Sequence, residues 1–357
     1  MAEGVSTTVR SVRRLPQGRR VQTRFVAIWL ALAALVVISA IFVPRSLLPS
    51  SILAIIPFAA FLAITSMGEA LVLMARGIDL SIPAIVTLSS TMILGVSAGD
   101  DAGLAAAIVV ALLLSVAVGV ISGIFVAVFN LNSLVVTLAV GTIVAGLTLW
   151  YREGIAAEAR VPPALADWGG ARFLELNLSV WIAIALIVLF TVVLRFTGLG
   201  RRFIAVGANP RAAWIAGIGV ARYQILAYAS AALLYGIAGI LLSAFIRNPT
   251  LDVGRAYLLA PIAAAVLAGT AVTGGVGSMI SVAGAALFLT HLGQILKMLG
   301  LSTAIQFMVY GAAIALGMAL AGLQVSSVRD AAIRLLGRRS PPLAIRQNVD
   351  PRTSRRT

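Results

Sequence analysis

The sequence of 357 residues contains no cysteine, one histidine and only 12 acidic residues. Without cysteine, disulfides, thiolate catalysis and cysteine-ligated metals are excluded. The single histidine, His291, has no companion ligand, so we expect no metal site and no cofactor. The sequence also lacks the G-x-x-x-x-G-K-[ST] phosphate loop and any evident nucleophile–base pair. We therefore expect a protein without an enzymatic active site, and any ATP on which it depends must be hydrolysed by another polypeptide.

Charged residues are scarce, at 11%, whereas hydrophobic residues make up 61% of the chain and the mean hydropathy is +1.05. The excess of apolar surface must face lipid. The apolar runs are continuous and about twenty residues long, as helices that cross a bilayer require, whereas barrel strands would alternate. The sequence predicts an all-α polytopic membrane protein with about ten transmembrane helices. The predicted spans are residues 25–43, 52–75, 80–98, 103–129, 134–151, 178–195, 223–246, 257–272, 277–296 and 303–322.

Most of the 27 Lys and Arg residues lie in or beside three segments, namely residues 1–24, 198–222 and 323–357. Such clusters mark the cytoplasmic side of a membrane. We therefore predict a basic cytoplasmic N-tail over 1–24, a membrane domain over 25–322 and a basic cytoplasmic C-tail over 323–357, which we expect to be disordered. The tails suit anionic lipid headgroups. No aromatic pattern or motif of nucleic-acid binding accompanies the charge, so we expect no nucleic-acid partner.

The basic loop over residues 198–222 carries the signature of a short helix. Asn209 is a favourable N-cap residue, Pro210 occupies the preferred first helical position, and Gly217 supplies the usual stop. We therefore predict a helix over Pro210–Ala216, outside the membrane and between two long spans.

This predicted helix offers apolar side chains to water. It presents Ala212, Ala213 and Ile215, with Trp214 as an aromatic anchor. Apolar residues on a water-facing helix suggest a docking surface, because aromatic side chains in a partner's pocket supply much of the binding energy. An amphipathic helix resting on the membrane surface would also use Trp and Arg. Of these two interpretations we favour docking.

Small residues recur at every fourth position of the predicted span 103–129, where Ser115, Gly119, Gly123 and Ala127 share one face. Helices in lipid associate by close approach of their backbones, which small side chains permit. We interpret this face as a helix-packing surface.

Four segments follow one another with a recognisable order and spacing. They are GIDLSIPAIVTL (Gly77–Leu88), NSLVVTLAVGTIVAGLTLW (Asn132–Trp150), GRRFIAVGANPRAAWIAGIGVAR (Gly200–Arg222) and LAGTAVTGGVGS (Leu267–Ser278). Together they resemble the permease subunits of ATP-binding-cassette (ABC) importers for monosaccharides, the ribose and xylose type. The resemblance covers about Phe25 to Gly322. It implies a type II importer permease fold, the bacterial cytoplasmic (inner) membrane, and a small sugar or polyol as substrate.

By this resemblance, the short predicted helix looks like the coupling helix that sits in a groove of the ATPase subunit. The matching positions are Asn209, Pro210, Arg211, Ala212, Ala213, Trp214 and Gly217. Importer permeases commonly carry an acidic residue before the paired alanines, where this chain has Arg211, so ion pairs at the interface are expected to differ.

The resemblance also implies a set of partners. Separate ABC ATPase subunits would dock from the cytoplasm and drive import, and a periplasmic or lipid-anchored sugar-binding protein would deliver the substrate. A second permease copy, identical or similar, would complete a dimer with the path at its interface. The alternative to an ABC importer is a secondary transporter that works without an ATPase.

Glu69 is the carboxylate that falls within a predicted span, where a charge costs about 2.5–3.5 kcal/mol and usually faces a cavity or a partner. It would act as a proton or ion relay, line the sugar path, or make a buried hydrogen bond to a neighbouring helix, with Arg76 as a candidate partner. We favour the structural interpretation. If the protein were a secondary transporter, Glu69 would be the first candidate for the residue that relays the proton or ion.

Further candidates for the path or its gate lie near the ends of predicted spans. Asp79 and Ser81 are plausible helix caps, and the resemblance adds a role at the inner gate. Asn132, Ser133 and Thr137 would hydrogen-bond a passing sugar or satisfy broken helix ends. Family members often have Pro-Phe in place of Asn132-Ser133.

The glycine-dense segment TAVTGGVGS contains the last two candidates, Gly274 and Gly275. Interrupted apolar segments in transporters often mark unwound backbone near the path. A close-packed turn would need the same glycines, and the two interpretations stay open.

Overall fold

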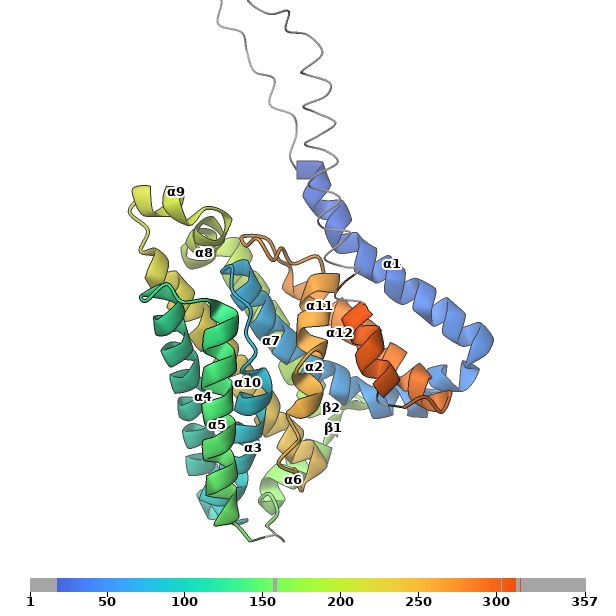
Figure 1. Cartoon of the computed structure of the whole chain (residues 1–357). Helices are drawn as coiled ribbons and strands as arrows, with labels where there is room; N and C mark the ends of the chain where they lie inside the picture. The colour runs from blue at the N-terminus through green and yellow to red at the C-terminus, as the bar shows by residue number, and fades with distance from the viewer. Residues whose placement is uncertain (1–17, 157–158, 303, 313–314, 316–357) are drawn as a thin grey trace, which may run out of the picture. The chain divides into compact units, whose positions relative to one another are not determined.

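The computed structural model describes residues 18–156, 159–302, 304–312 and 315 (Figure 1). Residues 1–17 of the predicted N-tail lie outside this part, as does the whole predicted C-tail. Residues 303, 313–314 and 316–322 of the predicted tenth span lie outside it too, although residues 304–312 of that span are helical.

Most of the described residues are helical. Seven helices are long and apolar enough to cross a membrane. They are α1 (Gly18–Phe42), α2 (Pro49–Met74), α4 (Leu104–Ala127), α5 (Ser133–Glu153), α7 (Leu178–Phe196), α10 (Val220–Ile246) and α12 (Met279–Met298). The shorter α-helices are α3 (Ile82–Ser97), α6 (Pro163–Gly170), α8 (Gly198–Ala208), α9 (Pro210–Ile215) and α11 (Ala260–Leu267). Short 3-10 turns lie at Pro44–Leu47, Asp101–Gly103 and Arg255–Tyr257.

The all-α fold class is confirmed, but the count of ten spans stays a prediction. Two of the predicted spans, 80–98 and 257–272, contain α3 and α11, which are shorter than a full crossing. The predicted span 257–272 ends in a loop because glycines follow α11. The strands β1 (Arg172–Phe173) and β2 (Leu176–Asn177) form an antiparallel hairpin between α6 and α7.

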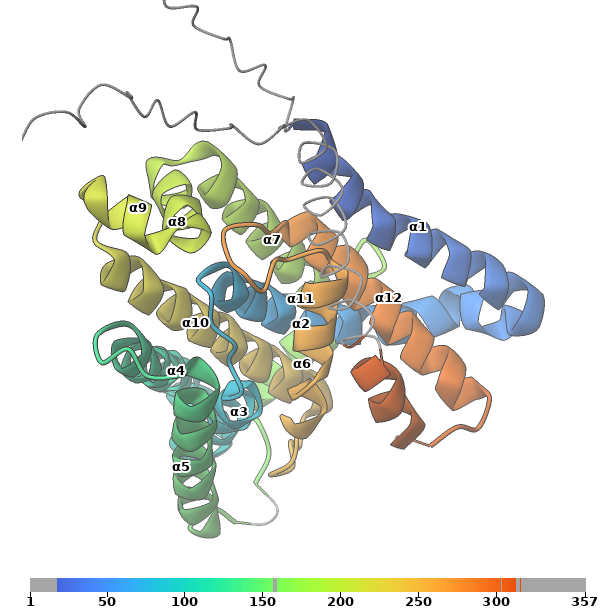
Figure 2. The same cartoon turned by 45° about the horizontal axis from the view of Figure 1, so that its top comes forward.

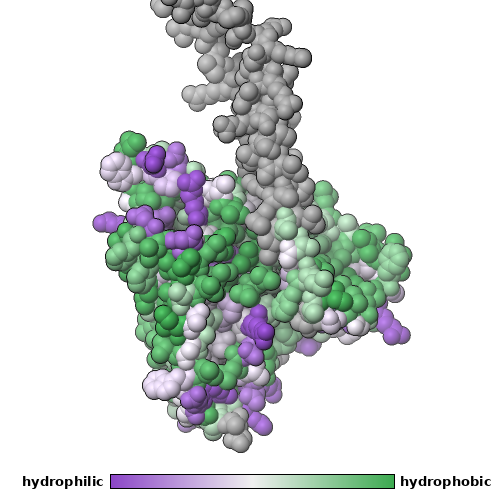
Figure 3. All heavy atoms as spheres, viewed as in Figure 1, coloured by the Kyte–Doolittle hydropathy of each residue, from purple (hydrophilic) through white to green (hydrophobic). Residues whose placement is uncertain are grey.

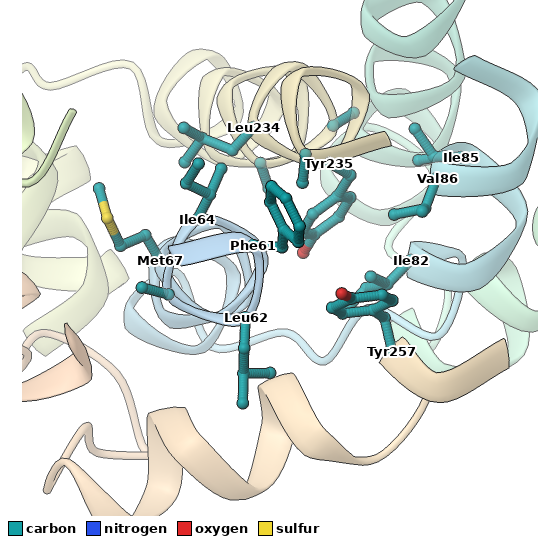
Figure 4. Packing of buried hydrophobic residues seen from close by; sticks show 14 of the residues in the cluster. Phe61, Leu62, Ile64, Met67, Ile82, Ile85, Val86, Leu234, Tyr235 and Tyr257 are labelled. Atoms are coloured by element: carbon teal, nitrogen blue, oxygen red, sulfur yellow. The ribbon is translucent and has the colours of Figure 1, made fainter. Parts of the chain in front are cut away.

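Two helices form the centre of the bundle. About two thirds of the apolar stretches of α2 and α10 are buried, 61% and 67%, against 28% or less in α1, α4, α5 and α7. Figure 4 shows side chains of α2, α3 and α10 in this core, among them Phe61, Ile85 and Leu234, which are all fully buried. The peripheral helices keep their apolar side chains on the surface (Figure 3), as lipid-facing helices do.

The small-residue face of α4 packs on α10, its most extensive neighbour. A Cβ atom added to Gly119 would lie 2.5 Å from the carbonyl oxygen of Tyr228 and 2.6 Å from the Cβ of Ala232. At Gly123 it would lie 2.9 Å from the Cα of Ile225. The helix-packing interpretation is therefore confirmed, because the two backbones approach too closely for side chains.

Gly119→Val is expected to destabilise the folded chain, because a branched side chain must push α4 away from α10. Overpacking of this kind typically costs about 1–3 kcal/mol. Thermal unfolding in detergent would measure the effect. The matched control is Gly146→Val in α5, since a Cβ placed there would meet no described atom within 4 Å apart from its chain neighbours and its own helix backbone. Equal unfolding temperatures for the two variants would contradict the prediction.

Candidate functional site

The helix predicted over Pro210–Ala216 is present as α9 and ends one residue earlier. Asn209 caps it, because its Oδ1 accepts a hydrogen bond of 3.1 Å from the Ala212 N–H. Gly217 follows with φ at 76°, and its N–H donates to Trp214 O. The next N–H, of Ile218, donates to Ala213 O. These bonds satisfy the end of the helix in the way that a left-handed glycine allows.

The outward face of α9 carries two large apolar side chains next to one arginine. Trp214 and Ile215 are 72% and 79% exposed, and Arg211 and Ala212 are exposed beside them. Ala213 is only 4% exposed. We predicted that Ala213 would belong to the presented surface, and this is wrong: α9 packs on α8, and Ala213 lies on the buried side. We call the exposed residues Arg211, Ala212, Trp214 and Ile215 the α9 surface.

Helix α8 supports α9 and was missed in the sequence, where only one short helix was expected in the loop. Thr197 caps α8, because its Oγ1 accepts from the Gly200 N–H over 3.1 Å. Phe203 and Val206 are buried, whereas Arg201 and Arg202 are exposed. The signal was present as an amphipathic pattern, with apolar residues on one side of a short basic segment. Figure 2 shows α8 and α9 as neighbouring helices beyond the end of α7.

Glu69 lies in the core of the bundle and is fully buried. Its Oε2 accepts a hydrogen bond of 3.3 Å from the backbone N–H of Asp79 and one of 3.5 Å from the hydroxyl of Tyr235 in α10. Arg76, which we considered as its partner, instead donates its Nε to Thr273 O over 2.8 Å. Glu69 therefore ties the turn after α2 to α10.

The turn between α2 and α3 is fastened by short polar side chains. The Oδ1 of Asp79 accepts from both the N–H and the hydroxyl of Ser81, at 2.8 and 2.6 Å. Ser133 and Thr137, in the first two turns of α5, accept from the backbone N–H groups of residues 78 and 80, at 3.2 and 2.9 Å. Ser81 occupies the N-cap position of α3, but its side chain makes no capping hydrogen bond. Its hydroxyl instead donates to the carboxylate of Asp79.

The structure thus brings five of the predicted residues into one largely buried polar cluster that joins α2, α3, α5 and α10. The polar cluster consists of Glu69, Asp79, Ser81, Ser133, Thr137 and the unpredicted Tyr235. Asn132 stays outside it, exposed, where its Oδ1 caps α5 by accepting from Leu134 N–H over 2.9 Å. Tyr235 was missed because a tyrosine within a long apolar run is normally interpreted as a hydrophobic core residue.

Gly274 and Gly275 lie apart from the hydrogen bonds of the polar cluster, in the loop between α11 and α12. Their φ values are 91° and 75°, in the left-handed region that favours glycine. The N–H of Gly275 donates to Met74 O at the end of α2 over 2.9 Å. The two glycines therefore form a close-packed turn against other backbone segments. Among the described residues, no group of three or more His, Cys, Asp or Glu side chains is placed to hold a metal.

The chain matches the family described as "Branched-chain amino acid transport system / permease component" over residues 51–318. It is 34% identical to the ribose import permease protein RbsC of Bacillus subtilis (strain 168) over 294 residues, which cover 82% of this chain and 91% of that protein. It is 30% identical to the L-arabinose ABC transporter permease protein AraH of Azospirillum brasilense over 285 residues, 75% of this chain and 79% of that protein. No solved structure matches the chain.

Proposed function

Because the chain belongs to the family of branched-chain amino acid transport system permease components, we propose that it is the membrane permease of an ABC importer for a small sugar or polyol. Its similarity to a ribose permease extends over 91% of that relative, and a second relative is named for L-arabinose, which favours a sugar over an amino acid. Its ATPase and its sugar-binding protein are separate subunits, and the chain resides in the inner membrane with several spans.

The α9 surface is the observation that carries this proposal. A capped helix that exposes Trp214 and Ile215 outside the long apolar helices has the composition of a docking site. The helix packs on its neighbour α8, and Ala213, on the side opposite the α9 surface, is buried within the fold. We assign Asn209–Gly217 as the coupling helix that the ATPase subunit receives.

The orientation follows from charge. Residues 198–222 include four arginines, at positions 201, 202, 211 and 222, and no acidic residue. By the positive-inside rule this loop faces the cytoplasm, and both termini face the same side. The outward-facing apolar helices contact lipid, and a second permease copy completes the path at an interface between the two.

The polar cluster is suited to fix the position of the α2–α3 turn at the inner end of that path. It ties the α2–α3 turn to α5 and α10 by hydrogen bonds to backbone N–H groups. Such bonds must be exchanged for others when the turn moves, so the polar cluster would stabilise one state of the gate. Asn132, exposed next to it, is the candidate that reaches the substrate directly.

Purification of the tagged chain in mild detergent tests the assignment. We expect a soluble ATPase with a phosphate-binding loop to be recovered with it and identified by mass spectrometry. Recovery of the chain alone, under conditions that keep other importers intact, would contradict the importer assignment and favour the secondary transporter.

A further inference from the structure

Three backbone segments meet where α8 ends. The first is Gly207 of α8, the second is the end of α2 at Met74, and the third is the loop between α11 and α12 at Gly274 and Gly275. Figure 1 shows this loop beside α8 and the end of α2. The hydrogen bond from Gly275 N–H to Met74 O joins two of the three segments directly.

The contact leaves no room for a side chain on α8. A Cβ atom added to Gly207 would collide with the Met74 carbonyl oxygen and lie 2.7 Å from the backbone nitrogen of Gly275. In the loop, a Cβ added to Gly274 would lie 2.5 Å from Gly207 O. One added to Gly275 would lie 2.6 Å from the Cα of Ala208. The obstructing atoms are mainly backbone, so the neighbours cannot give way by changing rotamer.

A second link fixes the loop to α2. Arg76 has a φ of 73°, at the position after a helix end where glycine is usual. Its Nε donates to Thr273 O over 2.8 Å. The loop is therefore held to α2 by one backbone and one side-chain hydrogen bond, and α8 is set directly against both. We call Gly207, Gly274 and Gly275 the glycine junction.

We propose that the glycine junction transmits movement of α8 and α9 to the inner end of α2 and to the α11–α12 loop. Helices α8 and α9 are short and joined by one residue, Asn209, so a push on α9 reaches Gly207 within a few residues. Because packed interiors are hard to compress, a displacement of α8 should move the backbone segments that it contacts directly. The proposal rests on the assignment of α9 as the ATPase-docking helix.

The variant Gly207→Ala tests whether the glycine junction transmits this movement. Alanine is a better helix former than glycine, so α8 itself gains stability, while the added methyl group must separate α8 from Met74 and Gly275. We expect the ATPase to be recovered with the variant and to hydrolyse ATP within about twofold of the parent rate, because the α9 surface is intact. Sugar transported per ATP should fall about tenfold or more.

Gly198→Ala, at the first position of the same helix, is the matched control. Apart from its chain neighbours and its own helix backbone, the nearest atom to a Cβ placed there is 4.0 Å away, at the end of the Arg201 side chain. The experiment uses the complete complex in proteoliposomes, with radiolabelled ribose and L-arabinose as probes. Transport per ATP equal in the two variants would overturn the proposal, as would loss of ATPase recovery in Gly207→Ala. Failure of the parent chain to recover an ATPase would instead count against the importer assignment.

Discussion

Replacing Trp214 and Ile215 together by alanine should abolish recovery of the ATPase and stop sugar uptake, while the amount of chain in the membrane stays unchanged. Both side chains are mostly exposed in the isolated chain, at 72% and 79%, so their removal leaves no cavity in the fold. Central aromatic anchors of an interface contribute about 2 kcal/mol or more each, which is roughly thirtyfold in affinity.

The matched control for this double variant is Trp150→Ala. Trp150 is the same residue type with the same exposure of 72%, and it lies near the end of α5. We expect Trp150→Ala to recover the ATPase as the parent chain does. If the double variant still recovers the ATPase and transports sugar at the parent rate, α9 is not the docking helix.

The second large effect is expected at Glu69, where two substitutions should differ sharply. Glu69→Leu leaves the Asp79 N–H and the Tyr235 hydroxyl without the carboxylate that accepts from them. Each buried donor left unsatisfied costs about 1–3 kcal/mol. We therefore expect little folded chain in the membrane for this variant. Glu69→Gln keeps an oxygen acceptor of similar size and should fold and transport at near the parent rate.

This pair of variants also separates the two functional hypotheses. Glutamine does not take up or release protons near neutral pH, so a transporter that relays protons through residue 69 would lose uptake in Glu69→Gln. Uptake and the amount of folded chain should be measured together. Loss of uptake with a normal amount of folded Glu69→Gln chain would contradict the structural role and support the secondary transporter.

The parts of the structure that the sequence predicts well are those set by local chemistry. The cap at Asn209, Pro210 at the first helical position and the left-handed Gly217 fix α9 to within one residue. The small-residue face of α4 predicts close packing, because its spacing admits one interpretation in lipid. Membrane-spanning length likewise identifies the seven long helices.

What the sequence does not predict depends on contacts between distant segments. The burial of Ala213 depends on how α9 packs against its neighbouring helices, and the choice of Thr273 rather than Glu69 as partner of Arg76 depends on how the α11–α12 loop folds back. Tyr235 joins Glu69 across 166 positions in the chain. Gly274 and Gly275 were identified as unusual, but their neighbour Gly207 sits in an ordinary helical pattern and gives no local signal.

The most direct test of the central claim is sugar uptake by proteoliposomes that hold the complete complex with ATP on the ATPase side. Radiolabelled ribose and L-arabinose serve as probes, with the binding protein on the opposite side. The account predicts uptake that requires ATP and continues when a protonophore collapses the proton gradient. Uptake that proceeds without ATP and ceases with the protonophore would contradict it.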